Sequence, residues 1–177
     1  MKKLSVIALA WMALLAFGAG AAERPMLVVI EMIDINAKPD QVWRLLGRFD
    51  GLKDWHPLFS GSDIISGRDG KVGAVRKLTI KDGPSFTEEL VALDVANRSL
   101  TYDIIESPLP LTDYLSSVGV KANANGGSTV IWVGQFRRKN GLDNPPEGET
   151  DAAMVGLISG AYRGGLVNLK QIVEAGK

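Results

Sequence analysis

The sequence has no cysteine, and His56 is the only histidine among its 177 residues. The lack of cysteine excludes disulfides, thiol catalysis, c-type haem attachment and thiolate metal sites. A single histidine also falls short of the ligand set that a zinc site requires. We therefore predict no metal site and no cofactor, and we expect a hydrophobic core alone to stabilise the fold.

The sequence also lacks an excess of positive or negative charge, because 20 Lys and Arg residues balance 20 Asp and Glu residues. Proteins that bind nucleic acid usually carry a clear basic excess, and proteins held at a membrane surface often carry a polybasic patch. This sequence has neither. We expect no nucleic-acid partner.

Residues 1–22 have the pattern of a signal peptide. Two lysines open the segment, an uncharged apolar run covers residues 4–17, and small residues follow at 18–22. The apolar run is shorter than the roughly 20 residues of a membrane-spanning helix. We predict cleavage after this segment, no stable membrane anchor, a single domain at residues 23–177 and a periplasmic location in a Gram-negative cell.

The longest predicted helix covers residues 150–175. Thr150 or Asp151 can cap its first turn, since either side chain can accept a hydrogen bond from a free backbone N–H group. Apolar residues recur at spacings of three and four, as one buried stripe requires. The predicted stripe consists of Val155, Ile158, Tyr162, Leu166, Leu169 and Val173.

Three glycines, Gly156, Gly160 and Gly164, repeat every fourth residue in this helix. Each lowers helix stability by about 1 kcal/mol relative to alanine. We expect close packing against a sheet to offset this cost. Room for a ligand is the second interpretation, and a bendable helix is the third.

The rest of the chain predicts one strand, two short helices and then a series of strands. Residues 26–36 are rich in β-branched residues, and two short helices follow at about 39–49 and 52–57. Period-two alternation with turn residues at regular intervals then favours antiparallel strands. These strands are predicted at residues 62–67, 72–80, 86–95, 100–106, 111–120 and 128–138. One helix across a curved sheet leaves a gap, which is usually a cavity.

In this order of elements the chain resembles the SRPBCC superfamily, which includes START domains and polyketide cyclase-like proteins. The resemblance implies an α+β helix-grip fold, with a curved antiparallel sheet of about six to seven strands around a long C-terminal helix and two short helices after the first strand. Its members include carriers, receptors and cyclases, so the fold does not decide the function. The motifs that carry the resemblance are AKPDQVW (37–43), FxxLxxWHP (49–57), GAVR (73–76), DG (82–83), EEL (88–90), RSLTY (98–102), PLP (108–110), STVIW (128–132) and GLxxLK (165–170).

In its size, its predicted export signal and its superfamily, the chain is similar to the MxaD-type accessory proteins of bacterial methanol oxidation. This resemblance implies a non-enzymatic periplasmic protein whose partners are methanol dehydrogenase and its c-type cytochrome acceptor. A second hypothesis is a periplasmic carrier or sensor of a small hydrophobic ligand held in the cavity. A third is a cyclase-like enzyme, which would need an acid–base pair in that cavity.

Arg76 is the first candidate ligand-binding residue, since it lies among apolar residues on one face of a predicted strand. A buried guanidinium requires a carboxylate partner, and Glu88, Glu89 and Glu31 are the candidates. The pair can anchor an anionic or carbonyl ligand, or it can be a structural ion pair, which we favour.

Tyr102, Tyr114 and Trp132 are further candidates for the cavity wall, where aromatic rings with polar tips suit an amphipathic ligand. Plain core packing is the alternative for all three. His56 is a candidate at the cavity mouth, although no neighbouring motif supplies an Asp or Ser partner for base catalysis. We predict no catalytic residue and expect the His56 ring to be hydrogen-bonded locally.

Overall fold

The computed structural model describes residues 24–176 and has α+β architecture, so the predicted signal peptide lies outside the described residues. The fold class is confirmed: seven antiparallel strands curve around a long C-terminal helix, and short helices follow the first strand. The elements are β1 (Leu27–Ile35), α1 (Pro39–Leu46), the 3-10 turn η1 (Phe49–Gly51), α2 (Leu52–Trp55), β2 (Phe59–Ser66), β3 (Val75–Ile80), β4 (Ser85–Asp94), β5 (Ser99–Glu106), β6 (Leu111–Ala122), β7 (Ser128–Arg138), the 3-10 turn η2 (Glu147–Glu149) and α3 (Asp151–Ala175).

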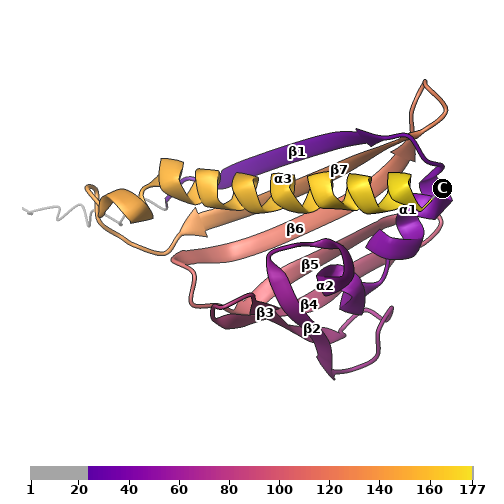
Figure 1. Cartoon of the computed structure of the whole chain (residues 1–177). Coiled ribbons are helices and arrows are strands. Elements are labelled where there is room, and N and C mark those ends of the chain that lie inside the picture. The colour runs from indigo at the N-terminus through magenta and orange to yellow at the C-terminus, as the bar shows by residue number, and fades with distance from the viewer. Residues whose placement is uncertain (1–23, 177) are drawn as a thin grey trace, which may run out of the picture.

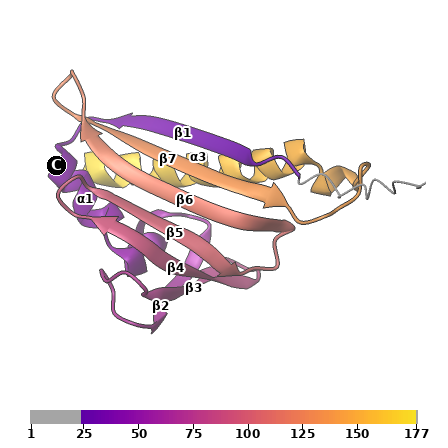
Figure 2. The same ribbon diagram turned by 180° about the vertical axis from the view of Figure 1, so that it is seen from behind.

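The strands form one sheet in the order β1-β7-β6-β5-β4-β3-β2, with antiparallel neighbours throughout. Strands β2 to β7 form a meander joined by short connections, as the regular turn residues predict. The first strand, β1, pairs with the last one, β7. Helix α3 crosses one side of the sheet, α1 lies near the C-terminal end of α3, and α2 lies on the same side of the sheet (Figure 1). Among residues 24–176, no helix covers the other side of the sheet (Figure 2).

Helix α3 begins as the sequence predicts. The Thr150 hydroxyl accepts a hydrogen bond from the Ala153 N–H at 3.1 Å. Five of the six predicted stripe residues are buried, but Met154 takes the place of Val155 at the start of the stripe. Met154 lies four residues before Ile158, so the stripe follows the i, i+4 ridge of the helix.

The expected close packing of Gly156, Gly160 and Gly164 is wrong. All three face outward, and a Cβ added to any of them would meet no atom within 4 Å. Close approach occurs instead at Gly165, where a Cβ would lie 2.4 Å from the His56 ring. The period of four follows the outer face of the helix, because the buried stripe occupies the opposite side.

Two strands differ from simple period-two alternation. β3 begins at Val75 and not at residue 72, because Gly73 has a φ of +86° and Val72 is 63% exposed. In β6, the register shifts between Thr112 and Leu115, and Asp113 has a φ of +52°. This bulge brings Leu111 and Tyr114 onto the same buried face although they lie three residues apart.

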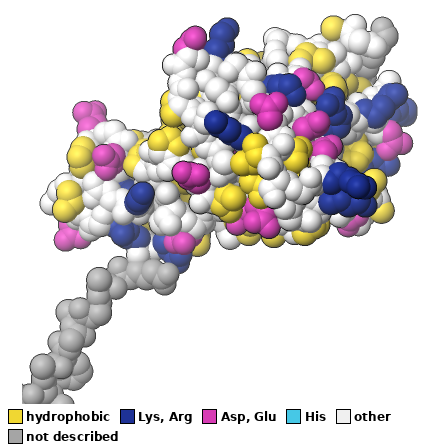
Figure 3. Space-filling view, turned by 90° about the horizontal axis from the view of Figure 1, so that it is seen from below, with side chains coloured by type: hydrophobic (Ala, Val, Ile, Leu, Met, Phe, Trp, Pro, Cys, Tyr) yellow, Lys and Arg dark blue, Asp and Glu magenta, His cyan; other side chains and the backbone are white. Residues whose placement is uncertain are grey.

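The face seen from below the view of Figure 1 carries Lys and Arg side chains mixed with Asp and Glu side chains, with hydrophobic groups between them (Figure 3). This mixture agrees with the balanced composition of the chain. Within residues 24–176, no helix is long and apolar enough to cross a membrane.

Candidate functional site

A cavity of about 170 Å³ lies between the sheet and the first half of α3. Its wall is mostly apolar, and Leu58 and Leu157 at its rim are partly exposed, so the cavity opens to the surface beside them. Residues from α2, six strands, two loops and α3 contribute. They are Leu52, His56, Leu58, Phe59, Ile80, Phe86, Glu88, Tyr102, Ile104, Leu109, Tyr114, Trp132, Leu157, Ile158, Ala161 and Tyr162.

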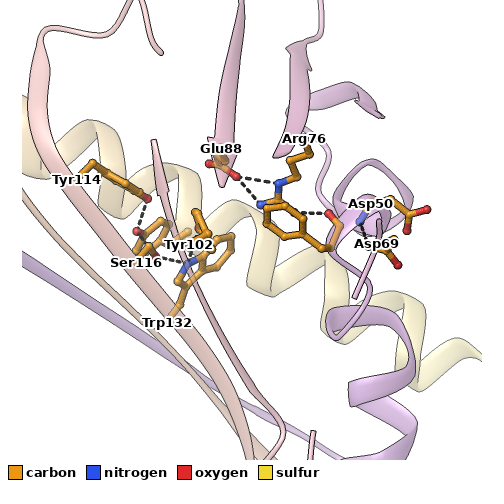
Figure 4. Close-up of polar contacts among 10 residues, drawn as sticks. Asp50, Asp69, Arg76, Glu88, Tyr102, Tyr114, Ser116 and Trp132 are labelled. Atoms are coloured by element: carbon orange, nitrogen blue, oxygen red, sulfur yellow. Dashed lines mark hydrogen bonds and ion pairs between the residues drawn. The ribbon is translucent and has the colours of Figure 1, made fainter. Parts of the chain in front are cut away.

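Arg76 and Glu88 are direct neighbours on β3 and β4 and form a buried ion pair (Figure 4). Arg76 Nε and one terminal nitrogen donate to Glu88 Oε2 at 2.8 and 2.5 Å. The other terminal nitrogen donates to the Phe49 carbonyl at 2.5 Å. The guanidinium also lies 4.1 Å from the centre of the Phe49 ring, so Arg76 is fixed on several sides.

Glu88, and not Arg76, faces the cavity. Arg76 is absent from the cavity wall and lies behind the carboxyl group that it binds. Burial raises the pKa of Glu88, while the charge of Arg76 acts in the opposite direction. The ion pair that the sequence suggested is confirmed, with Glu88 as the partner. Glu31 instead binds Arg163 and Ser159 of α3.

A cluster of hydroxyl groups beside the cavity joins the sheet to α3 (Figure 4). The Tyr162 hydroxyl lies 2.5 Å from that of Tyr114 and 2.8 Å from that of Ser116. The Trp132 indole N–H is shared between Ser116 at 2.9 Å and Tyr102 at 3.0 Å. The Trp132 and Tyr162 rings stack with their centres 4.2 Å apart. Burial raises the pKa of Tyr162 to about 12, and the pKa values of Tyr102 and Tyr114 are raised by the same cause.

The His56 ring joins α2 to α3. Nδ1 accepts a hydrogen bond from the Leu58 N–H at 3.2 Å, so the ring proton is on Nε2, which donates to the Ala161 carbonyl at 3.0 Å. Burial lowers the pKa of His56 to about 4, which keeps the ring neutral at pH 7. The expected local bond is present, but the bond to α3 was not foreseen. Both ring nitrogens are engaged, so neither is available as a base.

Five of the six predicted site residues line the cavity: His56, Glu88, Tyr102, Tyr114 and Trp132. Their role in ligand binding stays a prediction. Sequence reasoning placed Tyr162 in the core stripe of the last helix and overlooked Ser116. The signal for Tyr162 is a hydroxyl in the middle of an apolar stripe, since a buried hydroxyl needs a hydrogen-bond partner. The small Gly134 of β7 lies beside it, because a Cβ there would lie 2.3 Å from the Tyr162 oxygen.

Comparison with known proteins shows which family the chain resembles. A family described as polyketide cyclase / dehydrase and lipid transport matches residues 26–174. An abscisic acid receptor of Arabidopsis thaliana is 25% identical over 143 residues, which are 79% of this chain and 75% of the receptor.

Two bacterial structures are also similar. The protein XoxI of Bacillus cereus shares 32% sequence identity with a TM-score of 0.72, over 82% of this chain and 94% of XoxI. An uncharacterized protein of Bacillus thuringiensis shares 30% identity with a TM-score of 0.70, over 83% of this chain and 98% of its own. With the family match covering nearly all of the described residues, the chain belongs to the polyketide cyclase / dehydrase and lipid transport family.

Proposed function

We propose that the protein is a carrier or sensor that binds one small, mostly apolar molecule between the sheet and α3. The observation that carries this proposal is the cavity of about 170 Å³, which is walled by apolar and aromatic side chains. Its size is close to the apolar cavity of about 150 Å³ that accepts benzene in another protein. The family description and the named relative, a receptor for abscisic acid, also support ligand binding.

Binding without catalysis is favoured by the state of the groups that could move a proton. Both nitrogens of His56 are hydrogen-bonded, and the pKa of its ring is lowered to about 4. Burial raises the pKa values of the tyrosines far above neutral pH. General acid–base catalysis works best with a pKa near the working pH. We expect no turnover of aromatic or polyketide-like compounds.

Filling the cavity from α3 tests the proposal. Ala161 lines the cavity, so Ala161→Leu places additional carbon atoms inside it. Ala152 is exposed on the same helix, and Ala152→Leu is the matched control. Native mass spectrometry of protein isolated from its own cells is expected to reveal a discrete added mass in the wild type and in the control. Equal retention of that mass by Ala161→Leu would contradict binding in this cavity.

A second candidate is the accessory role in methanol oxidation, with export directed by residues 1–22. The supporting observation is the outer face of β1, where Val28, Ile30 and Met32 are exposed in alternation. Exposed apolar surface of this kind is typical of protein contacts. The expected partners are methanol dehydrogenase and its c-type cytochrome.

Electron transfer between these two partners tests the second candidate. Wild-type protein is expected to speed the transfer, and Ile30→Asp is expected to remove the effect. Val91→Asp is the control, since Val91 is exposed on β4 at a distance from β1 in the sheet. An unchanged transfer rate on addition of the wild type would contradict this role.

A further inference from the structure

The two oxygens of Glu88 have different roles. Oε2 accepts both hydrogen bonds from Arg76, whereas Oε1 makes no hydrogen bond to any part of the chain within residues 24–176. Glu88 is 3% exposed and lines the cavity. Oε1 is therefore the oxygen of the ion pair that is open to a hydrogen-bond donor placed in the cavity.

The ion pair keeps Glu88 negatively charged. The Arg76 guanidinium stays protonated at all ordinary pH values, and among the described residues its one ion pair is with Glu88. Protonating Glu88 would leave a buried cation unpaired, which is strongly unfavourable. Oε1 is therefore a hydrogen-bond acceptor. Since the pair as a whole is neutral, a charged ligand beside it would lack compensation.

Tyr114 presents a second acceptor. Ser116 donates to the Val133 carbonyl and accepts from the Trp132 N–H, so its proton is not available to Tyr162. Tyr162 must then donate to Ser116, and Tyr114 must donate to Tyr162. The Tyr114 proton is therefore used within the cluster, and its oxygen keeps free lone pairs.

We propose that the ligand is a neutral, ring-sized compound that carries a hydroxyl group, a phenol in the simplest case, and that its O–H donates to Glu88 Oε1. This inference rests on the proposed function. It reverses the polarity of the less favoured interpretation of the sequence, in which Arg76 anchors an anionic or carbonyl ligand. A carboxylate ligand would meet the carboxylate of Glu88 and be repelled, and an ammonium group would add an uncompensated charge to a neutral pair.

The test compares compounds of the same shape by NMR titration of the full mature chain. In para-xylene a methyl group replaces the hydroxyl of para-cresol, and para-toluate carries a carboxylate at that position. A hydrogen bond to a charged group favours the donor by roughly tenfold to a hundredfold. We expect para-cresol to bind at least about tenfold more tightly than para-xylene, and para-toluate to bind more weakly than both.

A double variant removes the acceptor without leaving a lone buried charge. Replacing both charged partners by apolar residues, as in Arg76→Met with Glu88→Leu, is often tolerated. In this variant we expect para-xylene to bind more tightly than para-cresol. The wild-type series alone keeps the inference testable if the variant does not fold.

The outcomes separate the two levels of the proposal. Wild-type preference for para-xylene or para-toluate would overturn the hydroxyl inference, while the proposed function would stand because a ligand is bound. Absence of binding by all three compounds at millimolar concentration would overturn the proposed function and the inference with it. Preference for para-cresol that reverses in the double variant supports both.

Discussion

Two adjacent glycines in α3 are expected to respond to the same substitution with opposite signs. Gly164 faces outward, and a Cβ there would meet no atom within 4 Å. Gly164→Ala should therefore raise the free energy of unfolding by about 0.5–1 kcal/mol through helix propensity alone. At Gly165, a Cβ would lie 2.4 Å from Cδ2 and 2.7 Å from Nε2 of His56.

The His56 ring cannot move aside without further cost. It is held by hydrogen bonds at both nitrogens, and its centre lies 4.8 Å from that of the Phe59 ring. Overpacking of this kind costs about 1–3 kcal/mol, and a lost hydrogen bond adds about 0.5–1.5 kcal/mol. After the gain in helix propensity, Gly165→Ala should destabilise the fold by roughly 0.5–4 kcal/mol.

Urea unfolding of both variants at pH 7.5, monitored by tryptophan fluorescence, measures the difference. The m-value should stay unchanged, since neither substitution alters the surface exposed on unfolding. A second measurement in a His56→Ala background should remove most of the cost of Gly165→Ala, because the clashing ring is gone. Equal stability of Gly164→Ala and Gly165→Ala would refute the close contact between α3 and His56.

Three further predictions concern the ionisable and hydroxyl groups. Burial lowers the pKa of His56 from 6.5 to about 4, so between these pH values the unfolded chain binds a proton that the folded chain does not. The free energy of unfolding should therefore be highest above pH 6.5 and should fall by roughly 3 kcal/mol as the pH drops to about 4. As His56 is the only histidine, its ring resonances in NMR can follow this titration, and a pKa near 6.5 would contradict the buried neutral ring. Arg76→Met alone should cost about 3–5 kcal/mol by leaving Glu88 buried and unpaired, and adding Glu88→Leu should recover most of it in urea unfolding. Tyr162→Phe should cost about 1–3 kcal/mol, since Tyr114 and Ser116 lose a buried partner; no change in the unfolding midpoint would speak against the cluster.

Most of the fold could be predicted from the sequence because its signals are local. Period-two alternation and turn residues indicate hairpins, and the stripe in residues 150–175 indicates the helix that covers them. The errors arise where a single residue departs from its period. Asp113 introduces a bulge into β6. Gly73 has a positive φ, so the strand predicted from residue 72 begins only at Val75.

The candidate site was predictable in its members but not in its polarity. Arg76 could have paired with Glu88 or Glu89, since a shift of one residue in the hairpin register exchanges the two faces. The observed register pairs Arg76 with Glu88. Which of the two partners faces the cavity depends on the curvature of the sheet, for which no single residue carries a signal. Tyr162 was overlooked as a site residue because an aromatic ring in a helix stripe normally indicates core.

The pairing of β1 with β7 has a consequence for the order of folding. Strands β2 to β7 are joined by short connections, but each pair between β1 and β7 links residues roughly a hundred positions apart, from Leu27↔Phe136 to Ile35↔Ser128. Contacts so distant along the chain form late in folding. Glu31 of β1 also forms an ion pair with Arg163 of α3, so the first strand and the last helix of the described residues contact each other as well as the meander. Helix α3 supplies Leu157, Ile158, Ala161 and Tyr162 to the cavity wall. The cavity is therefore complete only once this last helix has joined the sheet, and a chain that still lacks it cannot hold a ligand there.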